Sequence, residues 1–254
     1  MVVLGLIAGA AIGWSVLGQV QTSPANALIA SMKRAGAAIH DLDATITIET
    51  YKDGAVALTQ EVRLLLRQPD AMRLVYLAPA YLAGNVTLIV GSEMSVYIAA
   101  ADQWYRKNLA TLQSAEQPWL LMRNVLEDVH DLLSEYAFTL THEARDGKTV
   151  DHLDGVPAVS GATYGRIELW VDPETMVPLE RKLYDVDGNL LADARFSNEA
   201  QVAPGVVLPL AIETYDAAGS LASRITYKDP IVNHGLDSGL FTPPPEAVGQ
   251  GDGK

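Results

Sequence analysis

The sequence predicts a mainly β protein: an antiparallel sheet large enough to curl into a barrel or half-barrel, with two or three helices covering its concave face. Three observations support this fold class. Short segments of alternating apolar and polar residues lie between Gly, Pro and Asp turns, which is typical of hairpin-linked strands. Only two segments have helical periodicity. No linker divides the 254 residues, so we expect one domain with one sizeable core.

The two helical segments are expected at about residues 26–41 and 117–134. In the first, apolar side chains recur at helical spacing, at Leu28, Met32, Ala35, Ile39 and Leu42. In the second, Pro118 suits the first turn of a helix, and the apolar face includes Met122 and Leu126. Both helices must bury an apolar stripe, and the concave face of the sheet is the available place.

The strands begin where the period of the pattern changes to two. In 44–51, Ala44, Ile46 and Ile48 alternate with polar residues, and the hairpin signal at residues 52–54 leads into a strand at about 56–67. Further strand-like segments lie between about 71 and 109 and between about 136 and 228. We expect about ten or eleven short strands in all, enough for the sheet to curl.

Composition excludes several classes of function. The formal net charge of -13 argues against nucleic acid as a partner, because binding phosphates requires clustered Lys and Arg. It also predicts that any bound lipid is held by apolar contact rather than by its headgroup charge. The absence of cysteine excludes disulfides, Cys-ligated metals, a thiol nucleophile and a lipid attached to an N-terminal Cys.

No motif predicts catalysis. The five histidines lack the spacing of HExxH or of a zinc pair. The segment from Asp185 to Gly188 resembles the start of a calcium loop, but without the other acidic positions a hairpin turn is favoured. Nucleophile-elbow, P-loop and dinucleotide motifs are missing from the sequence. We therefore expect no catalytic residue, no metal and no cofactor.

The N-terminal segment resembles an export signal. Residues 2–18 are apolar or small, and Ala25-Asn26-Ala27 is a small-x-small cleavage site, so we predict a signal peptide over 1–27. The alternative is a retained membrane anchor, because 17 residues are at the short limit for a span and Gly5, Gly9 and Gly13 are spaced as in packed transmembrane helices. At the other end, we expect 246–254 to be a flexible tail.

Three stretches of sequence resemble the LolA-like family of periplasmic lipoprotein carriers and lipoprotein-sorting proteins. Residues 64–79 (LLLRQPDAMRLVYLAP) match its strand, basic residue, Pro and strand pattern. Residues 167–190 (IELWVDPETMVPLERKLYDVDGNL) match its WVD-type turn, Pro-Leu and DG turn. Residues 237–245 (DSGLFTPPP) match its closing motif. The order of the three is more specific than any one alone, and the likeness spans nearly all of 28–245, which we expect to be the lipid-binding domain.

The resemblance implies an incomplete, half-open antiparallel β-barrel whose hydrophobic cavity is covered by helices that move aside for the ligand. In carriers of the family, an Arg just before the first Pro motif helps to hold this helical lid shut. Arg67 is the matching position, although Gln68 intervenes before the Pro, and Arg73 is the alternative. The chain is longer than typical carriers, which leaves open a relative with another apolar cargo.

The expected lipid-binding residues combine the apolar sides of the strands with the lid helix. They are Ile46, Ile48, Val62, Leu64, Leu66, Met72, Leu74, Val86, Leu88, Val96, Ile98, Met122, Leu126 and Leu169.

Two functions follow from these expectations. The first is a periplasmic, monomeric carrier that binds acyl chains of lipoproteins or another lipid and meets membrane donor and acceptor proteins transiently. The second is a lipid-sensing or protein-binding regulatory module of envelope signalling. Relatives of the second kind carry a further domain, whereas the strands here run to the end of the chain without a linker, which favours the carrier.

Overall fold

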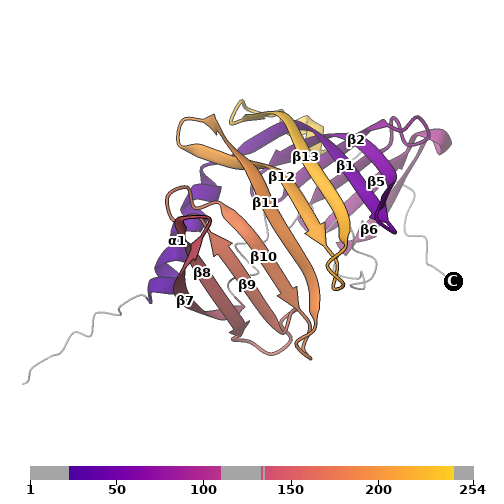
Figure 1. Ribbon diagram of the computed structural model, residues 1–254. Helices are drawn as coiled ribbons and strands as arrows, with labels where there is room; N and C mark the ends of the chain where they lie inside the picture. Colours follow the sequence, from indigo (N-terminus) through magenta and orange to yellow (C-terminus); the bar gives the residue numbers. More distant parts are fainter. Residues whose placement is uncertain (1–22, 110–132, 134, 243–254) are drawn as a thin grey trace, which may run out of the picture.

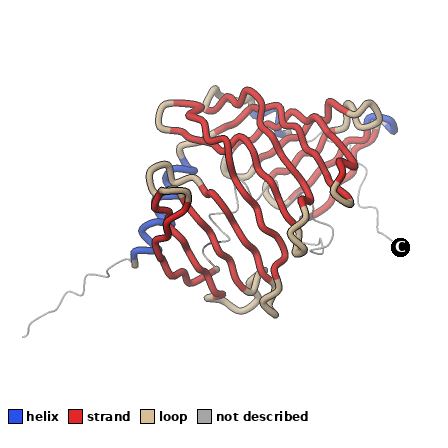
Figure 2. Tube along the Cα trace, viewed as in Figure 1, coloured by secondary structure: helices blue, strands red, loops and turns tan. Residues whose placement is uncertain are grey.

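A computed structural model describes residues 23–109, 133 and 135–242, which form one strongly curved antiparallel sheet (Figures 1 and 2). Its strand order is β6-β5-β4-β3-β2-β1-β13-β12-β11-β10-β9-β8-β7. The strands are β1 (Asp41–Lys52), β2 (Ala55–Arg67), β3 (Ala71–Ala78), β4 (Val86–Val90), β5 (Glu93–Ile98), β6 (Gln103–Asn108), β7 (Tyr136–Arg145), β8 (Lys148–Pro157), β9 (Arg166–Val171), β10 (Pro178–Tyr184), β11 (Leu190–Ala203), β12 (Val206–Tyr215) and β13 (Leu221–Val232). The described strands leave β6 and β7 as unjoined ends, which confirms the expected half-open barrel.

Strands that follow one another in sequence pair in this sheet, which makes it two antiparallel meanders, one from β1 to β6 and one from β7 to β13. The turn from β1 to β2 is the expected hairpin, in which Asp53 and Gly54 have φ angles of 53° and 76°. The sheet has thirteen strands rather than ten or eleven, because every short segment between two turns pairs as a strand of its own. The two meanders join where β1 pairs with β13.

The helix α1 (Pro24–Ala37) and two short 3-10 turns, η1 (Ala99–Ala101) and η4 (Ser238–Phe241), complete the described elements. The helix begins two residues earlier than expected because the Ser23 hydroxyl accepts a hydrogen bond from the Asn26 amide at 3.1 Å and Pro24 occupies the first turn. It ends four residues earlier, since Ile39 and Leu42 enter the sheet core instead of continuing the helix.

Two sequence predictions concern residues outside the described part of the chain. The second helix, predicted over 117–134, lies there except for Leu133, as does the tail. The signal peptide stays a prediction, and the cleavage position expected after Ala27 falls within the first turn of α1. None of the described helices is long and apolar enough to cross a membrane.

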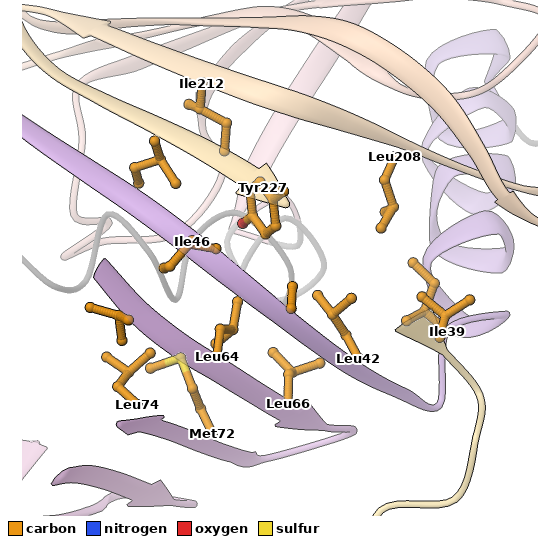
Figure 3. Close-up of a cluster of buried hydrophobic side chains, with 14 of the residues drawn as sticks. Ile39, Leu42, Ile46, Leu64, Leu66, Met72, Leu74, Leu208, Ile212 and Tyr227 are labelled. Carbon is orange, nitrogen blue, oxygen red and sulfur yellow. The ribbon is translucent and has the colours of Figure 1, made fainter. Parts of the chain in front are cut away.

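The curvature gathers apolar side chains from both meanders into one core on the inner face (Figure 3). Leu64 and Met72 of the first meander and Phe196 and Ile212 of the second belong to the same cluster of buried residues. A flat sheet would hold these strands far apart, since neighbouring strands are about 4.8 Å from each other. Burial of this shared core therefore stabilises the bend as well as the strands.

The outer face of the first meander is covered by η4. Phe241 is buried with Leu65, Ala71 and Leu88. The Arg67 guanidinium lies 4.8 Å from the centre of the Phe241 ring. Next to it, Arg73 donates a hydrogen bond to the Leu240 carbonyl at 2.8 Å. These contacts attach the last described residues to β2, β3 and β4.

The outer face of the second meander carries polar and aromatic side chains around Trp170 of β9. The His152 ring stacks on its indole with 4.3 Å between centroids, and the Arg145 guanidinium lies 4.2 Å from the indole centre. The indole N–H donates to Glu143 at 3.0 Å, and Arg145 pairs with Glu180. Such pairs on an accessible face contribute little stability individually, but they keep this face polar.

We expect Phe241→Ala to lower the free energy of unfolding by about 3–5 kcal/mol, because it removes the buried ring that closes the outer cluster. Urea denaturation of the full chain measures the loss. Val186→Ala is the control: Val186 is 82% exposed, so its replacement should change stability by less than about 0.5 kcal/mol. Equal urea midpoints for the two variants would contradict the role of η4.

Candidate functional site

An apolar cavity of about 110 Å³ lies on the inner face, beside α1. Its wall comes from α1, from the link between α1 and β1, from the turn between β9 and β10, and from β11, β12 and β13. The lining residues are Met32, Ala35, Gly36, Ile39, Leu42, Gln68, Thr175, Met176, Val177, Pro178, Phe196, Gly205, Val206, Val207, Leu208, Pro209 and Tyr227. Most of these side chains are apolar, so the space suits a hydrocarbon group.

One half of α1 fixes the helix and the other half forms the cavity wall. Ala25, Leu28 and Ile29 are buried against the second meander, in a cluster that includes Leu153 and Leu169. Met32 belongs to this cluster and also lines the cavity, followed one turn later by Ala35 and Gly36. The small side chains at these two positions leave space between the helix and the sheet.

The turn between β9 and β10 forms the opposite part of the wall. The buried Asp172 carboxylate accepts hydrogen bonds from the Glu174 and Thr175 amides at 2.8 and 3.2 Å. The Met176 amide donates to the Asp172 carbonyl, and Met176 has a left-handed φ of 61°. A positive φ is uncommon for residues other than Gly and Asn. The Asp172 carboxylate holds the turn in the conformation that places Met176 at the cavity.

The strands provide the third side of the cavity. Leu42 lies at the start of β1, just after Ile39 in the link from α1, while Leu208 lies on β12 and Tyr227 on β13 (Figure 3). Burial raises the pKa of the Tyr227 phenol well above its usual range, so the phenol stays protonated and neutral. The Gln68 side-chain amide donates to the Gly36 carbonyl at 3.1 Å, which ties the turn after β2 to the end of α1.

The structure places most of the expected lipid-binding residues on the inner face, next to the cavity rather than around it. Ile46, Val62, Leu64, Leu66, Met72 and Leu74 belong to the shared core, and Ile48 packs against it. Leu169 lies in the cluster beneath α1. Val96 and Ile98 share the inner side of β5 with Met94 and are partly buried. Met122 and Leu126 lie outside the described residues.

The placement of Val86 and Leu88 on the inner face is wrong. Leu88 pairs with Arg73 and Val86 with Val75, so both side chains point to the outer side of β4. Leu88 is buried there beneath Phe241. Because β4 is covered on both faces, its sequence VTLIV has no alternation that could distinguish them.

The predicted role of Arg67 in holding the helical lid shut stays a prediction, because the predicted second helix lies outside the described residues except for Leu133. Arg67 lies on the outer side of β2, over Phe241, whereas the cavity lies on the inner side. The alternative, Arg73, lies on the same outer side and binds Leu240. In the described part of the chain, both arginines therefore hold η4 rather than a cover of the cavity.

Sequence reasoning missed most of the lining. The sequence pattern places Met32 and Ile39 on a helical stripe but not at a binding site, and it does not mark Phe196, Leu208 or Tyr227 as lining residues. The signal was present as alternating apolar positions in β11, β12 and β13, but their meeting with α1 depends on the pairing of β1 with β13. The inner side of β10 also holds a buried charge, Arg181, in register with Leu169 and Ala194.

The described residues show no arrangement for metal chemistry. In the ranges 23–109 and 135–242 and at residue 133, no three His, Asp or Glu side chains are grouped so that they could hold a metal ion. At the hairpin after β10, the Asp185 carboxylate accepts hydrogen bonds from the Asp187 and Asn189 amides at 2.9 and 2.8 Å. The turn thus uses this carboxylate to hold its own backbone.

An open antiparallel half-barrel with an apolar cavity on its inner face is the class of protein that the geometry defines. A protein-family profile described as "Uncharacterized protein" matches residues 69–244. No curated protein sequence matches the chain. Together with the structural similarities below, the profile match shows that the chain belongs to the LolA-like family.

Three solved structures share this fold. A DUF1329 family protein from Desulfovibrio piger has a TM-score of 0.72 at 21% identity, over 87% of this chain and 98% of its own. A domain from Vibrio parahaemolyticus described as an outer membrane lipoprotein-sorting protein has a TM-score of 0.66 at 17% identity, over 85% and 94%. A LolA superfamily protein from Nitrosomonas europaea has a TM-score of 0.63 at 19% identity, over 85% and 97%.

We expect Asp172→Ala to open the cavity wall at the turn between β9 and β10, because the Glu174 and Thr175 amides lose their acceptor. The free energy of unfolding should fall by about 1–2 kcal/mol. Hydrogen–deuterium exchange should become faster at residues 174–177. The matched control, Asp185→Ala, removes a similar turn carboxylate that does not line the cavity, and it should accelerate exchange only at 187–189. Unchanged exchange at 174–177 in Asp172→Ala would show that the Asp172 carboxylate does not hold this turn in place.

Proposed function

We propose that the protein is a non-enzymatic periplasmic carrier that binds the acyl chains of lipoproteins or of another lipid at its inner face and delivers them toward the outer membrane. The observation that carries this proposal is the apolar cavity between α1 and the strands β11, β12 and β13. The fold shared with a lipoprotein-sorting domain supports the same function.

The physical chemistry of the inner face suits an acyl chain. Each buried methylene gains about 0.8 kcal/mol, so a few methylenes in the cavity provide useful affinity before the cost of ordering the chain. The cavity wall contributes apolar surface and no charged side chain. Several charged groups of the second meander lie on the outer side around Trp170, and the buried Arg181 on the inner side of β10 does not line the cavity. A net charge of -13 adds no attraction for anionic headgroups. The binding free energy therefore comes mainly from apolar contact, which favours ligands with a hydrocarbon chain.

Carrying requires release as well as binding. The first half of α1 packs on the sheet through apolar side chains, and its second half borders the cavity. A modest affinity based on a few methylenes permits transfer to a membrane acceptor, while a fully enclosed chain would be retained. Export, and transient contacts with donor and acceptor proteins in the membrane, belong to the same proposal.

A variant that fills the cavity tests the site. Ala35→Phe puts a ring into the space beside α1, and we expect acyl-probe affinity to fall at least tenfold, because losing two methylenes costs about 1.6 kcal/mol. The measurement is fluorescence titration of the full chain with an acyl chain that carries an environment-sensitive dye.

The matched control is Ala37→Phe, which adds the same ring two residues later on the exposed side of α1. It should bind the probe like the unmodified protein. Equal weakening by both variants would mean that the helix, and not the cavity, was disturbed. If the unmodified protein does not bind the probe, the carrier is wrong, and the protein-binding regulatory module becomes the better hypothesis.

A further inference from the structure

Tyr227 is the buried polar side chain that stands out at the cavity. It lies on β13 opposite Ile46 of β1, is 9% exposed, and belongs to the cavity lining (Figure 3). Its surroundings on the inner face are apolar, and Ile212, Ile225 and Leu42 belong to the same cluster of buried residues. A phenylalanine would fill the same place with the same ring, so the hydroxyl needs its own explanation.

No described residue forms a hydrogen bond with the Tyr227 hydroxyl. The other buried tyrosine, Tyr136, is satisfied: its hydroxyl donates to the Tyr164 carbonyl at 3.0 Å and accepts from the Tyr164 amide at 2.8 Å. Tyr184 donates to Glu168. Tyr227 lines the cavity, and its hydroxyl is not one of the fully buried polar atoms without a partner, so it faces space that a ligand can enter. A purely apolar ligand in that space would leave the hydroxyl unpaired at a cost in free energy.

The other polar side chains of the cavity wall, Gln68 and Thr175, each form a hydrogen bond with the backbone. The Gln68 amide donates to the Gly36 carbonyl, and the Thr175 hydroxyl accepts from the Val177 amide at 3.4 Å. Tyr227 therefore offers the cavity a hydrogen-bond donor that the described protein atoms leave unused. A tyrosine phenol is protonated at physiological pH, and burial raises the pKa of this one further.

The kind of acceptor follows from the surroundings. An ionised carboxylate in this apolar cavity would lose its hydration, and one hydroxyl cannot replace it. A neutral carbonyl loses much less on entering and needs one donor. A chain of methylenes alone would leave the hydroxyl unpaired.

We infer that the Tyr227 hydroxyl donates a hydrogen bond to the neutral carbonyl oxygen of an ester- or amide-linked acyl chain bound in the cavity. This inference rests on the proposed acyl-binding function and adds a ligand class to it: acyl esters or amides, in preference to free ionised fatty acids. It also assigns the position of the ligand, with the carbonyl beside β13 and the hydrocarbon among the apolar lining.

The test uses methyl palmitate labelled with ¹³C at the carbonyl, bound to the full chain and observed by isotope-edited infrared spectroscopy. The unmodified protein should shift the carbonyl band to lower wavenumber, as a hydrogen bond requires. Tyr227→Phe should still bind the ester, about fivefold more weakly, with the band at the position of an apolar surrounding. The matched control is Tyr76→Phe, which removes a hydroxyl from a tyrosine that packs against the same core but does not line the cavity. It should keep both the shift and the affinity.

Two further measurements separate the possible outcomes. Without ligand, Tyr227→Phe should unfold at the same or a higher urea concentration, because it removes a hydroxyl without a protein partner. Palmitate at pH 8 should bind more weakly than methyl palmitate. An unshifted band in the unmodified protein, or palmitate binding more tightly than the ester, would overturn the inference while leaving acyl binding intact. Failure of both ligands to bind any of the three proteins would overturn the proposed function together with it.

Discussion

The pairing of β1 with β13 is the constraint on which the rest of the structure depends. It joins the first and last of the described strands, with Ile46 opposite Tyr227 and Ile48 opposite Ile225. Side-chain hydrogen bonds fix its end: Asn233 accepts from the His40 amide at 2.7 Å and donates to the Ala38 carbonyl at 2.8 Å, and Asp41 accepts from the His234 and Gly235 amides at 3.0 Å. Without this pairing of β1 with β13, which we call the seam, the two meanders would share no core and the cavity would lose one wall.

The seam also explains why the two faces of the sheet differ so strongly. Because the bend brings the inner faces of both meanders together, their side chains bury each other, and α1 adds a third layer over β7 to β9. The outer faces diverge, so they are either covered locally, as by η4, or kept polar, as around Trp170. Lipid binding can thus be confined to one side, while the other side stays compatible with water.

Local patterns predicted the strands well, because alternation and turn chemistry are properties of short segments. The hairpin at Asp53 and Gly54 and the alternating residues of β1 are examples. The side-chain positions that the sequence did not predict depend on contacts between distant segments. The burial of Leu88 on the outer side depends on Phe241, and the place of Arg67 depends on the same ring. Tyr227 joins the cavity only through the register between β13 and β1, which no segment of either strand encodes alone.

Native mass spectrometry of the protein, purified after export and then extracted with organic solvent, tests the central claim most directly. If the protein is an acyl carrier, its mass exceeds that of the polypeptide, extraction removes the excess, and the extract contains ester- or amide-linked acyl chains. A bare polypeptide mass, together with failure to take up methyl palmitate, would contradict it.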